Sequence, residues 1–129
     1  MAETEVQLTD SILETVKLMD DFSLDDDSFD IPIIRYINSY LQILWMQGVG
    51  KSGFKVTGTT ETWADVLGPD TDRLMMAASY ISKKVKLAID PPQSTALYNA
   101  IDEQSKELGY YLRVESNIID AEEDEDEDN

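Results

Sequence analysis

The chain has 129 residues, of which 42% are hydrophobic, and this is enough for one folded domain with a single core. It carries 27 acidic residues against 10 basic ones, a net charge of −17, so it should repel nucleic acid backbones rather than bind them. Because the sequence contains neither cysteine nor histidine, disulfides and thiolate metal sites are excluded, and catalytic triads, zinc sites and haem ligation are disfavoured. We therefore predict no enzymatic activity and no cofactor.

Targeting signals are equally sparse in this sequence. It contains no run of 18 apolar residues, and its first five residues include two glutamates and do not lead into the hydrophobic region of a signal peptide. We expect neither a membrane span nor a secretory signal, and the lack of cysteine fits a reducing compartment.

The first predicted helix covers about residues 10–19. Ile12, Val16 and Met19 recur at helical spacing, and Ser11 with Glu14 matches a capping box. Residues 20–30 then include six aspartates, which disfavour a helix interior, so this segment is predicted to be an exposed linker. It is not expected to bind calcium, because it lacks the turn glycine and the final glutamate of an EF-hand loop.

A second and stronger helix is predicted from Asp30, with Pro32 in its first turn, to about Gly48, which can supply a left-handed cap. Its apolar band is wide enough to predict burial on two sides, in the core or against another subunit. The band consists of one stripe of Ile34, Ile37, Leu41 and Leu44 and a neighbouring stripe of Ile33, Tyr36, Tyr40 and Ile43.

Residues 48–60 contain four glycines and predict a loop with a short extended piece around residues 54–56. Within it, the run from Gly48 to Ser52 resembles the end of a phosphate-binding loop. Trp45 occupies the position of the first glycine of that motif, and the segment follows a helix instead of a strand. We therefore do not expect nucleotide binding.

Two helices follow the glycine loop. A brief one is predicted over residues 62–67, closed by Gly68 and Pro69, and a long one is predicted to be capped by Asp70 or Thr71. The long helix ends at Asp90, since Pro91 and Pro92 stop it. Its apolar face is formed by Leu74, Ala78, Ile81, Val85 and Ala88.

A last helix is predicted from about residue 95, capped by Ser94, to about residue 117. Its inner face comprises Leu97, Ile101, Leu108 and Leu112, interrupted at Gln104 or Ser105. Residues 120–129 contain eight acids and no base and are prone to disorder. The predicted fold is thus all-α, a small bundle of about four to five helices with one long glycine-containing loop. We divide it into an N-terminal helix and acidic linker (1–29), a helical domain (30–119) and an acidic tail (120–129).

Several side chains are candidates for contact with partners. Lys83, Lys84 and Lys86 form a basic cluster that is either a solvated face, a contact for acid on a neighbouring copy, or a phosphate contact. Trp63 is expected in the core. Tyr110 and Tyr111 are adjacent on one helix, about 100° apart, so at least one should meet a partner.

The order of these segments resembles the small head–tail connector, or adaptor, proteins of tailed bacteriophages. The resemblance covers about residues 26–112. It rests on the ordered pieces DDDSFDIPI, YINSYLQIL, GVG, FKV, TETWADVLG, YISKKVKLAIDPP and STALYNAI. The long acidic tail is not part of the family pattern.

The resemblance implies a mostly α-helical structural virion protein without catalytic activity, located in the neck at the head–tail interface and assembled in the host cytoplasm. Such subunits form a ring, typically of twelve copies, below the portal protein. The ring extends the DNA channel and supports the next head-completion or tail protein, while DNA passes nearby without specific binding. In the family the C-terminal part commonly engages the portal, which here corresponds to residues 97–119.

Combining the resemblance with the apolar and basic surfaces gives two candidate sets of residues. A subunit or portal interface is expected at Ile33, Tyr36, Tyr40, Ile43, Lys83, Lys84, Lys86, Tyr110, Tyr111 and Arg113. A loop facing the channel or the next ring is expected at Gly48, Gly50, Lys51, Ser52, Gly53 and Lys55. Two alternatives stay open at this point: an acidic DNA mimic that inhibits a nucleic-acid-binding enzyme, and a generic helical adaptor protein.

Overall fold

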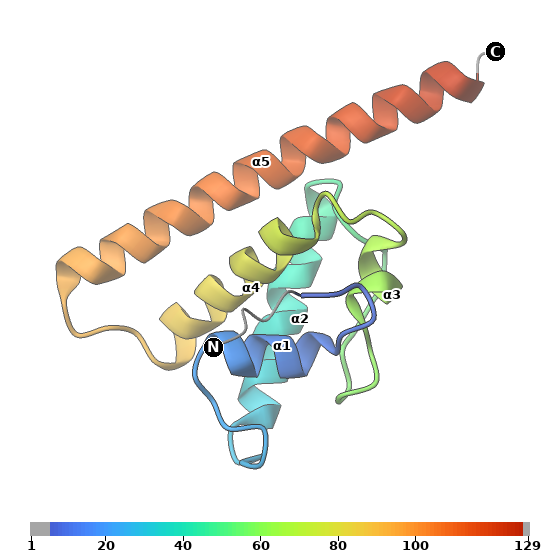
Figure 1. The fold of residues 1–129 in the computed structure, drawn as a ribbon. Helices are drawn as coiled ribbons and strands as arrows, with labels where there is room; N and C mark the ends of the chain where they lie inside the picture. The colour runs from blue at the N-terminus through green and yellow to red at the C-terminus, as the bar shows by residue number, and fades with distance from the viewer. Residues whose placement is uncertain (1–5, 128–129) are drawn as a thin grey trace.

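The computed structural model of this protein describes the backbone of residues 6–127 and the side chains of residues 6–115. Within that range the fold is all-α, as predicted, with one isolated β-bridge between Ser11 and Thr62 and no strand. Figure 1 shows the five helices in space. In chain order they are α1 (Ile12–Met19), α2 (Asp30–Met46), α3 (Trp63–Leu67), α4 (Leu74–Ile89) and α5 (Thr95–Glu127).

The core lies where α1, α2 and α4 pack on one another, with α3 contributing Trp63 to it. Trp63 is completely buried, and its indole Nε1–H donates to Thr15 Oγ1 on α1 at 3.1 Å. The buried polar end of the ring is thereby satisfied. The expectation that Trp63 belongs to the core is confirmed, and α1 packs in the same core as the later helices.

Local capping signals set most helix boundaries. The Ser11 hydroxyl accepts from the Glu14 N–H at 3.3 Å, and Thr62 with Asp65 forms a complete capping box at the start of α3. At the end of α2, the Gly48 N–H donates to Trp45 and the Val49 N–H donates to Leu44, which is the Schellman pattern. Gly48 has φ of 94°, a conformation that glycine adopts without strain.

The inward face of α2 differs from the predicted stripe. Ile33 is completely buried, and with Ile37, Leu41 and Leu44 it faces the core, whereas Ile34 is only partly buried. Side chains at 33, 37, 41 and 44 fall on one side of a helix as well as the predicted set does, so the sequence alone did not fix the rotation of α2. Ile33 is therefore not available at the surface of the folded subunit.

The start of α4 was also predicted wrongly. The helix begins at Leu74, after Arg73, and no side chain caps it. Asp70 instead organises the preceding turn, because its carboxylate accepts from the Asp72 N–H at 2.9 Å and from Arg73 Nε at 2.5 Å. A competing local turn has thus taken the aspartate that was expected to cap the helix.

The corner between α4 and α5 follows the sequence closely. α4 ends at Ile89, α5 begins at Thr95, and the Ser94 hydroxyl accepts from the Leu97 N–H at 3.2 Å. Figure 1 shows α5 folding back along α4 and continuing past the rest of the bundle. Its backbone remains helical to Glu127, beyond the predicted end near residue 117 and into the acidic segment. Side chains beyond residue 115 lie outside the described range.

The contact between α4 and α5 depends on small residues. A Cβ on Gly109 would lie 3.1 Å from Tyr80 Cε2, so glycine permits α5 to approach that ring closely. Ser105, one turn earlier, and Leu112 are completely buried in the same seam. Of the inner face predicted for α5, Leu112 is buried as expected. Leu97, in the first turn of α5, is instead 51% exposed.

Candidate functional site

Large apolar side chains remain exposed in several regions of the described chain, two of which are on α2 and α5. On α2 and its end they include Tyr36, Ile43, Trp45 and Met46, the last of which is 73% exposed. On α5 they are Leu97, Tyr98, Tyr110 and Tyr111. Exposed apolar groups gathered on particular helices are typical of protein–protein contact surfaces.

Tyrosine side chains of α2, α4 and α5 form two ring contacts, Tyr40 with Tyr80 and Tyr110 with Tyr111. Tyr40 and Tyr80 pack edge to face with their ring centroids 6.4 Å apart, and the Lys84 ammonium lies about 6 Å from both rings. Tyr40 and Tyr80 therefore face inward, whereas Tyr110 and Tyr111 are 51% and 56% exposed.

A groove with basic walls runs between α4, α5 and the end of α2, and we call it the basic groove. Its volume is about 280 Å³. Among its wall residues, Lys106 has a side chain that is 61% exposed, and Arg113 lies over the Tyr110 ring at 5.5 Å. The basic groove is lined by Gln47, Tyr80, Lys84, Lys106, Gly109, Tyr110 and Arg113.

A second groove lies on the other side of the seam between α4 and α5. It has a volume of about 350 Å³ and contains Lys83 and Tyr111 beside Glu107 and Leu108. The two adjacent tyrosines of α5 thus lie in different grooves, and Lys83 and Lys84 do as well. The rings of Tyr110 and Tyr111 nevertheless contact each other edge to face, with their centroids 5.3 Å apart.

The third lysine of the predicted cluster has an internal partner. Lys86 Nζ lies 3.5 Å from Asp90 Oδ2 and 3.3 Å from the Asp90 carbonyl, at the C-terminal end of α4. A cation in the last turn of a helix also interacts favourably with the helix dipole. Lys86 therefore has a structural role at the C-terminal end of α4.

The glycine loop, residues 48–60, is hydrogen-bonded to α2 through Asn38. The Asn38 side chain on α2 accepts from the Val56 N–H at 2.7 Å and donates to the Val56 carbonyl at 3.0 Å, as a strand partner would. Gly50 has φ of 100°, and a Cβ there would lie 3.2 Å from a methyl of Val66. Lys51, Ser52, Gly53 and Lys55 are exposed on this loop.

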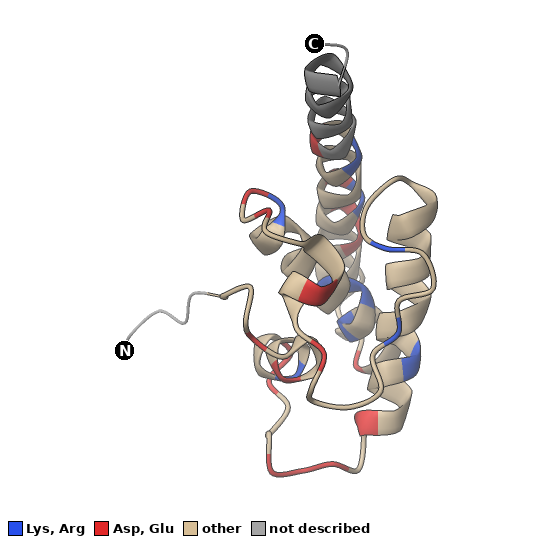
Figure 2. Cartoon of the chain, turned by 90° about the vertical axis from the view of Figure 1, so that its right-hand side faces the viewer, with Lys and Arg blue, Asp and Glu red and all other residues tan. Residues whose placement is uncertain are grey.

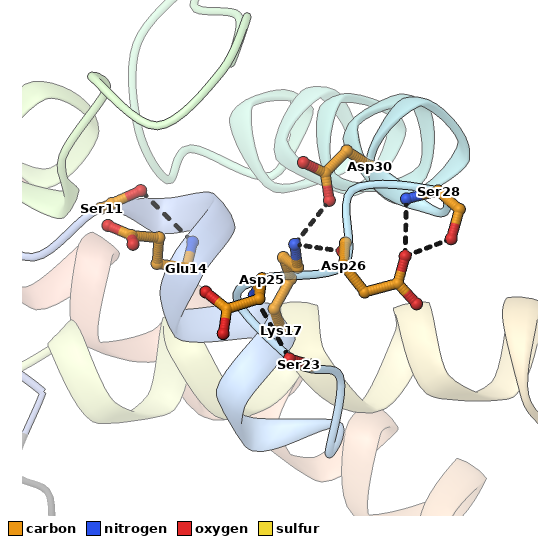
Figure 3. A network of polar contacts seen from close by, with 8 residues as sticks. All are labelled: Ser11, Glu14, Lys17, Ser23, Asp25, Asp26, Ser28 and Asp30. Atoms are coloured by element: carbon orange, nitrogen blue, oxygen red, sulfur yellow. Dashed lines mark hydrogen bonds and ion pairs between the residues drawn. The ribbon is translucent and has the colours of Figure 1, made fainter.

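The acid-rich segment between α1 and α2 is ordered around a lysine that the sequence did not single out. We call residues 21–29 the acidic loop. Figure 3 shows the Lys17 ammonium between the Asp30 carboxylate, at 2.7 Å, and the Asp26 carbonyl, at 2.9 Å. Lys17 is only 3% exposed. Its place on the buried face of α1, just before a run of aspartates, was a signal that this charge would be paired.

The acidic loop is therefore a shaped projection as well as a linker. Its turn is supported by the Asp26 carboxylate, which accepts from the Ser28 N–H and hydroxyl, and by a ring contact between Phe22 and Phe29. Asp25 and Asp27 stay exposed on it. Figure 2 shows this loop as the acidic stretch at the bottom of the view.

One aspartate beside this loop is buried without a partner. Asp20 is 7% exposed, and its Oδ2 atom has no hydrogen bond among the described residues. Burial raises the pKa of Asp20 to about 7; the nearby Lys86 opposes this rise and Asp21 adds to it. Lys83 also lowers this pKa and Asp90 raises it.

An apolar groove of about 430 Å³ lies along α1 beside the acidic loop, between Val6, Leu18, Met19 and Leu24. Leu18 and Leu24 are about half exposed. Sequence reasoning assigned nothing to this groove, because Leu18 and Leu24 do not form a helical stripe.

Metal and membrane sites were searched for in the described part of the chain. No group of three potential metal ligands occurs there, and no helix there is long and apolar enough to cross a membrane. The arrangement is one of contact surfaces, with apolar, basic and acidic regions on separate elements.

Replacing Lys17 with Met should destabilise the fold strongly. The change leaves the Asp30 carboxylate and the Asp26 carbonyl without their cation, and breaking such a buried pair costs about 3–5 kcal/mol, with the lower end expected because Asp30 is a quarter exposed. Urea unfolding followed by circular dichroism measures the loss. Lys55→Met, at an exposed position, is the control and should change stability by less than about 0.5 kcal/mol. Equal stability of the two variants would contradict a structural role for Lys17.

The buried Asp20 predicts an unusual pH dependence. Its folded pKa of about 7 exceeds the ordinary value of 3.8, so between these values the folded chain holds a proton that the unfolded chain has lost. The contribution of Asp20 to stability therefore falls as pH rises from 5.5 to 7.5, by up to about 1.4 kcal/mol per unit, and then levels off. Unfolding free energies of the wild type and Asp20→Asn at both pH values isolate this effect. A constant difference between the two proteins would disprove it.

The family described as phage connector protein matches residues 12–118, which include all of α1 to α4 and most of α5. Searches of curated proteins and of solved structures found no match. Because the family match spans most of the chain, this protein belongs to the phage connector protein family and is a structural component of the virion's head–tail connection.

Proposed function

We propose that copies of this chain form a ring, of about twelve subunits by family resemblance, between the portal and the tail or next head-completion protein. The observation that carries the proposal is the pair of exposed apolar regions on different helices. A subunit in a ring contacts two neighbours through two different surfaces, and these contacts are heterologous. The exposed residues of α2 and those of α5 supply two such surfaces.

The portal contact is assigned to α5. The backbone of this helix runs beyond the bundle in Figure 1. The resemblance implies a portal contact in residues 97–119, most of which lie within the family match to residues 12–118. Tyr111, which does not line the basic groove, is an exposed aromatic residue of this region that can anchor the portal.

The acidic surface suits a channel through which DNA moves. A net charge of −17 gives a duplex no continuous basic path to which it could adhere. The glycine loop, with Lys51 and Lys55 exposed, would face the channel or the next ring. Six acids lie in residues 20–30 and eight in residues 120–129, and this clustering in two segments of the chain does not favour a DNA mimic.

Mixing this protein with the portal of its phage should give rings below the portal, visible by negative-stain electron microscopy. Tyr111→Ala should reduce ring occupancy at least about tenfold, because exposed aromatic anchors carry much of an interface's energy. Asn99→Ala, at an exposed position on α5, serves as the control. Portal particles without any added density would refute the proposed function.

Self-repulsion between acidic copies should make assembly depend on salt. Charges further apart than about 8–10 Å are screened at physiological ionic strength. Raising salt from about 0.01 M to about 0.15 M, or adding divalent cations, should therefore increase the assembled fraction in sedimentation velocity experiments. A monomer that does not respond to ions, with or without portal, would count against ring formation.

A further inference from the structure

The basic groove is an exception on the surface of this protein. The chain has 27 acidic residues and 10 basic ones, yet none of the described residues that line the groove is acidic. Three of the ten basic residues, Lys84, Lys106 and Arg113, meet there. A concentration of one sign of charge in a hollow favours a ligand of the opposite sign.

The cations of the basic groove are partly fixed in place before any partner binds. Lys84 lies near the rings of Tyr40 and Tyr80, and Arg113 lies over the Tyr110 ring. Lys106 contacts Asp102 at 3.1 Å and Glu103 at 3.6 Å on its own helix, but these contacts are exposed and easily exchanged. Holding side chains in advance lowers the entropy cost of binding.

The best complement on this chain is the acidic loop. It presents the exposed carboxylates of Asp25 and Asp27, and its shape is held by Lys17. Leu24 and Phe29 are also exposed on it and can contact the tyrosine rings of the groove. The two surfaces therefore match in charge and in apolar character.

A single copy cannot bring these two surfaces together. The acidic loop ends where α2 begins, at Asp30, and the basic groove includes Gln47, just after α2 ends. A helix of 17 residues separates them by about 25 Å, and Figure 1 shows the two ends of α2 at opposite sides of the bundle. The contact must form between copies, in a head-to-tail manner that closes into a ring.

We propose that the acidic loop of each subunit docks into the basic groove of the next one. This inference rests on the proposed ring and specifies which surfaces join neighbouring copies. It also explains how a chain of net charge −17 can associate with itself, since the few cations are placed where the neighbour's carboxylates arrive.

Two charge-reversed variants test the contact. The groove variant carries Lys106→Glu and Arg113→Glu, and the loop variant carries Asp25→Lys and Asp27→Lys; all four residues are exposed. In each variant alone, like charges face each other at every contact, so assembly should need at least about tenfold more protein than the wild type. Sedimentation velocity at about 0.15 M salt, with portal added if the wild type needs it, measures this.

Mixing the two variants should restore assembly. The basic loop of one variant then meets the acidic groove of the other, and the acidic loop of the groove variant meets the unchanged groove of the loop variant. Rescue would yield alternating subunits and would also show that both variants are folded. A control that combines Arg35→Glu with Gln7→Glu and Gln93→Glu, all at exposed positions outside the two proposed surfaces, lowers the net charge by four as the groove variant does and should leave assembly unaffected.

Several outcomes would overturn the docking proposal. If both variants assemble alone as the wild type does, the ring uses other surfaces and the proposed function still stands. The same conclusion follows if their mixture fails to assemble although each is folded, or if removing residues 120–129 abolishes assembly while the loop variant is unaffected. If the wild type forms no assembly even with portal, both this inference and the proposed function fail.

Discussion

The close approach of α5 to α4 at Gly109 and Tyr80 determines which surfaces this protein presents. The glycine lets the two helices meet at a distance that a Cβ would prevent, and the buried Ser105 and Leu112 continue the seam. The two grooves flank that seam, and Tyr110 and Tyr111 lie one in each. The packing of one helix on another thus places the aromatic and basic side chains that are available to partners.

Basic side chains occupy two kinds of position in this structure, buried and exposed. Lys17 is buried and paired, so it shapes the acidic loop from inside without contributing a surface charge. Lys84, Lys106 and Arg113 remain at the surface and line one groove. An acidic chain can thereby keep most of its surface repulsive to DNA while it reserves its cations for ordered contacts.

The fold also explains how a small subunit can serve as part of a connector. Its core joins residues of α1, α2, α3 and α4 with Leu112 of α5, so the subunit has a core of its own. α5 is anchored by its seam with α4, and its backbone extends past that core. A long α2 keeps the acidic loop and the basic groove at opposite ends, and this separation favours contacts between different copies.

Short-range signals in the sequence were sufficient for the all-α class and for most helix boundaries. The two prolines after Asp90 end α4, Ser94 starts α5, and Gly48 ends α2, because these effects depend on residues a few positions apart. The family resemblance likewise rests on ordered motifs that the sequence displays directly, and the family match bears it out.

Tertiary structure decided the features that join distant parts of the chain. The rotation of α2 that buries Ile33, the pairing of Asn38 with Val56, and the separation of Tyr110 from Tyr111 into two grooves all depend on which helices pack together. Competition between local structures also matters: the Asp70 carboxylate accepts a hydrogen bond within a turn and therefore does not cap α4. The spacing of hydrophobic residues predicts that a helix has an apolar face. Which residues of that face are covered and which remain exposed depends on the elements that pack against it.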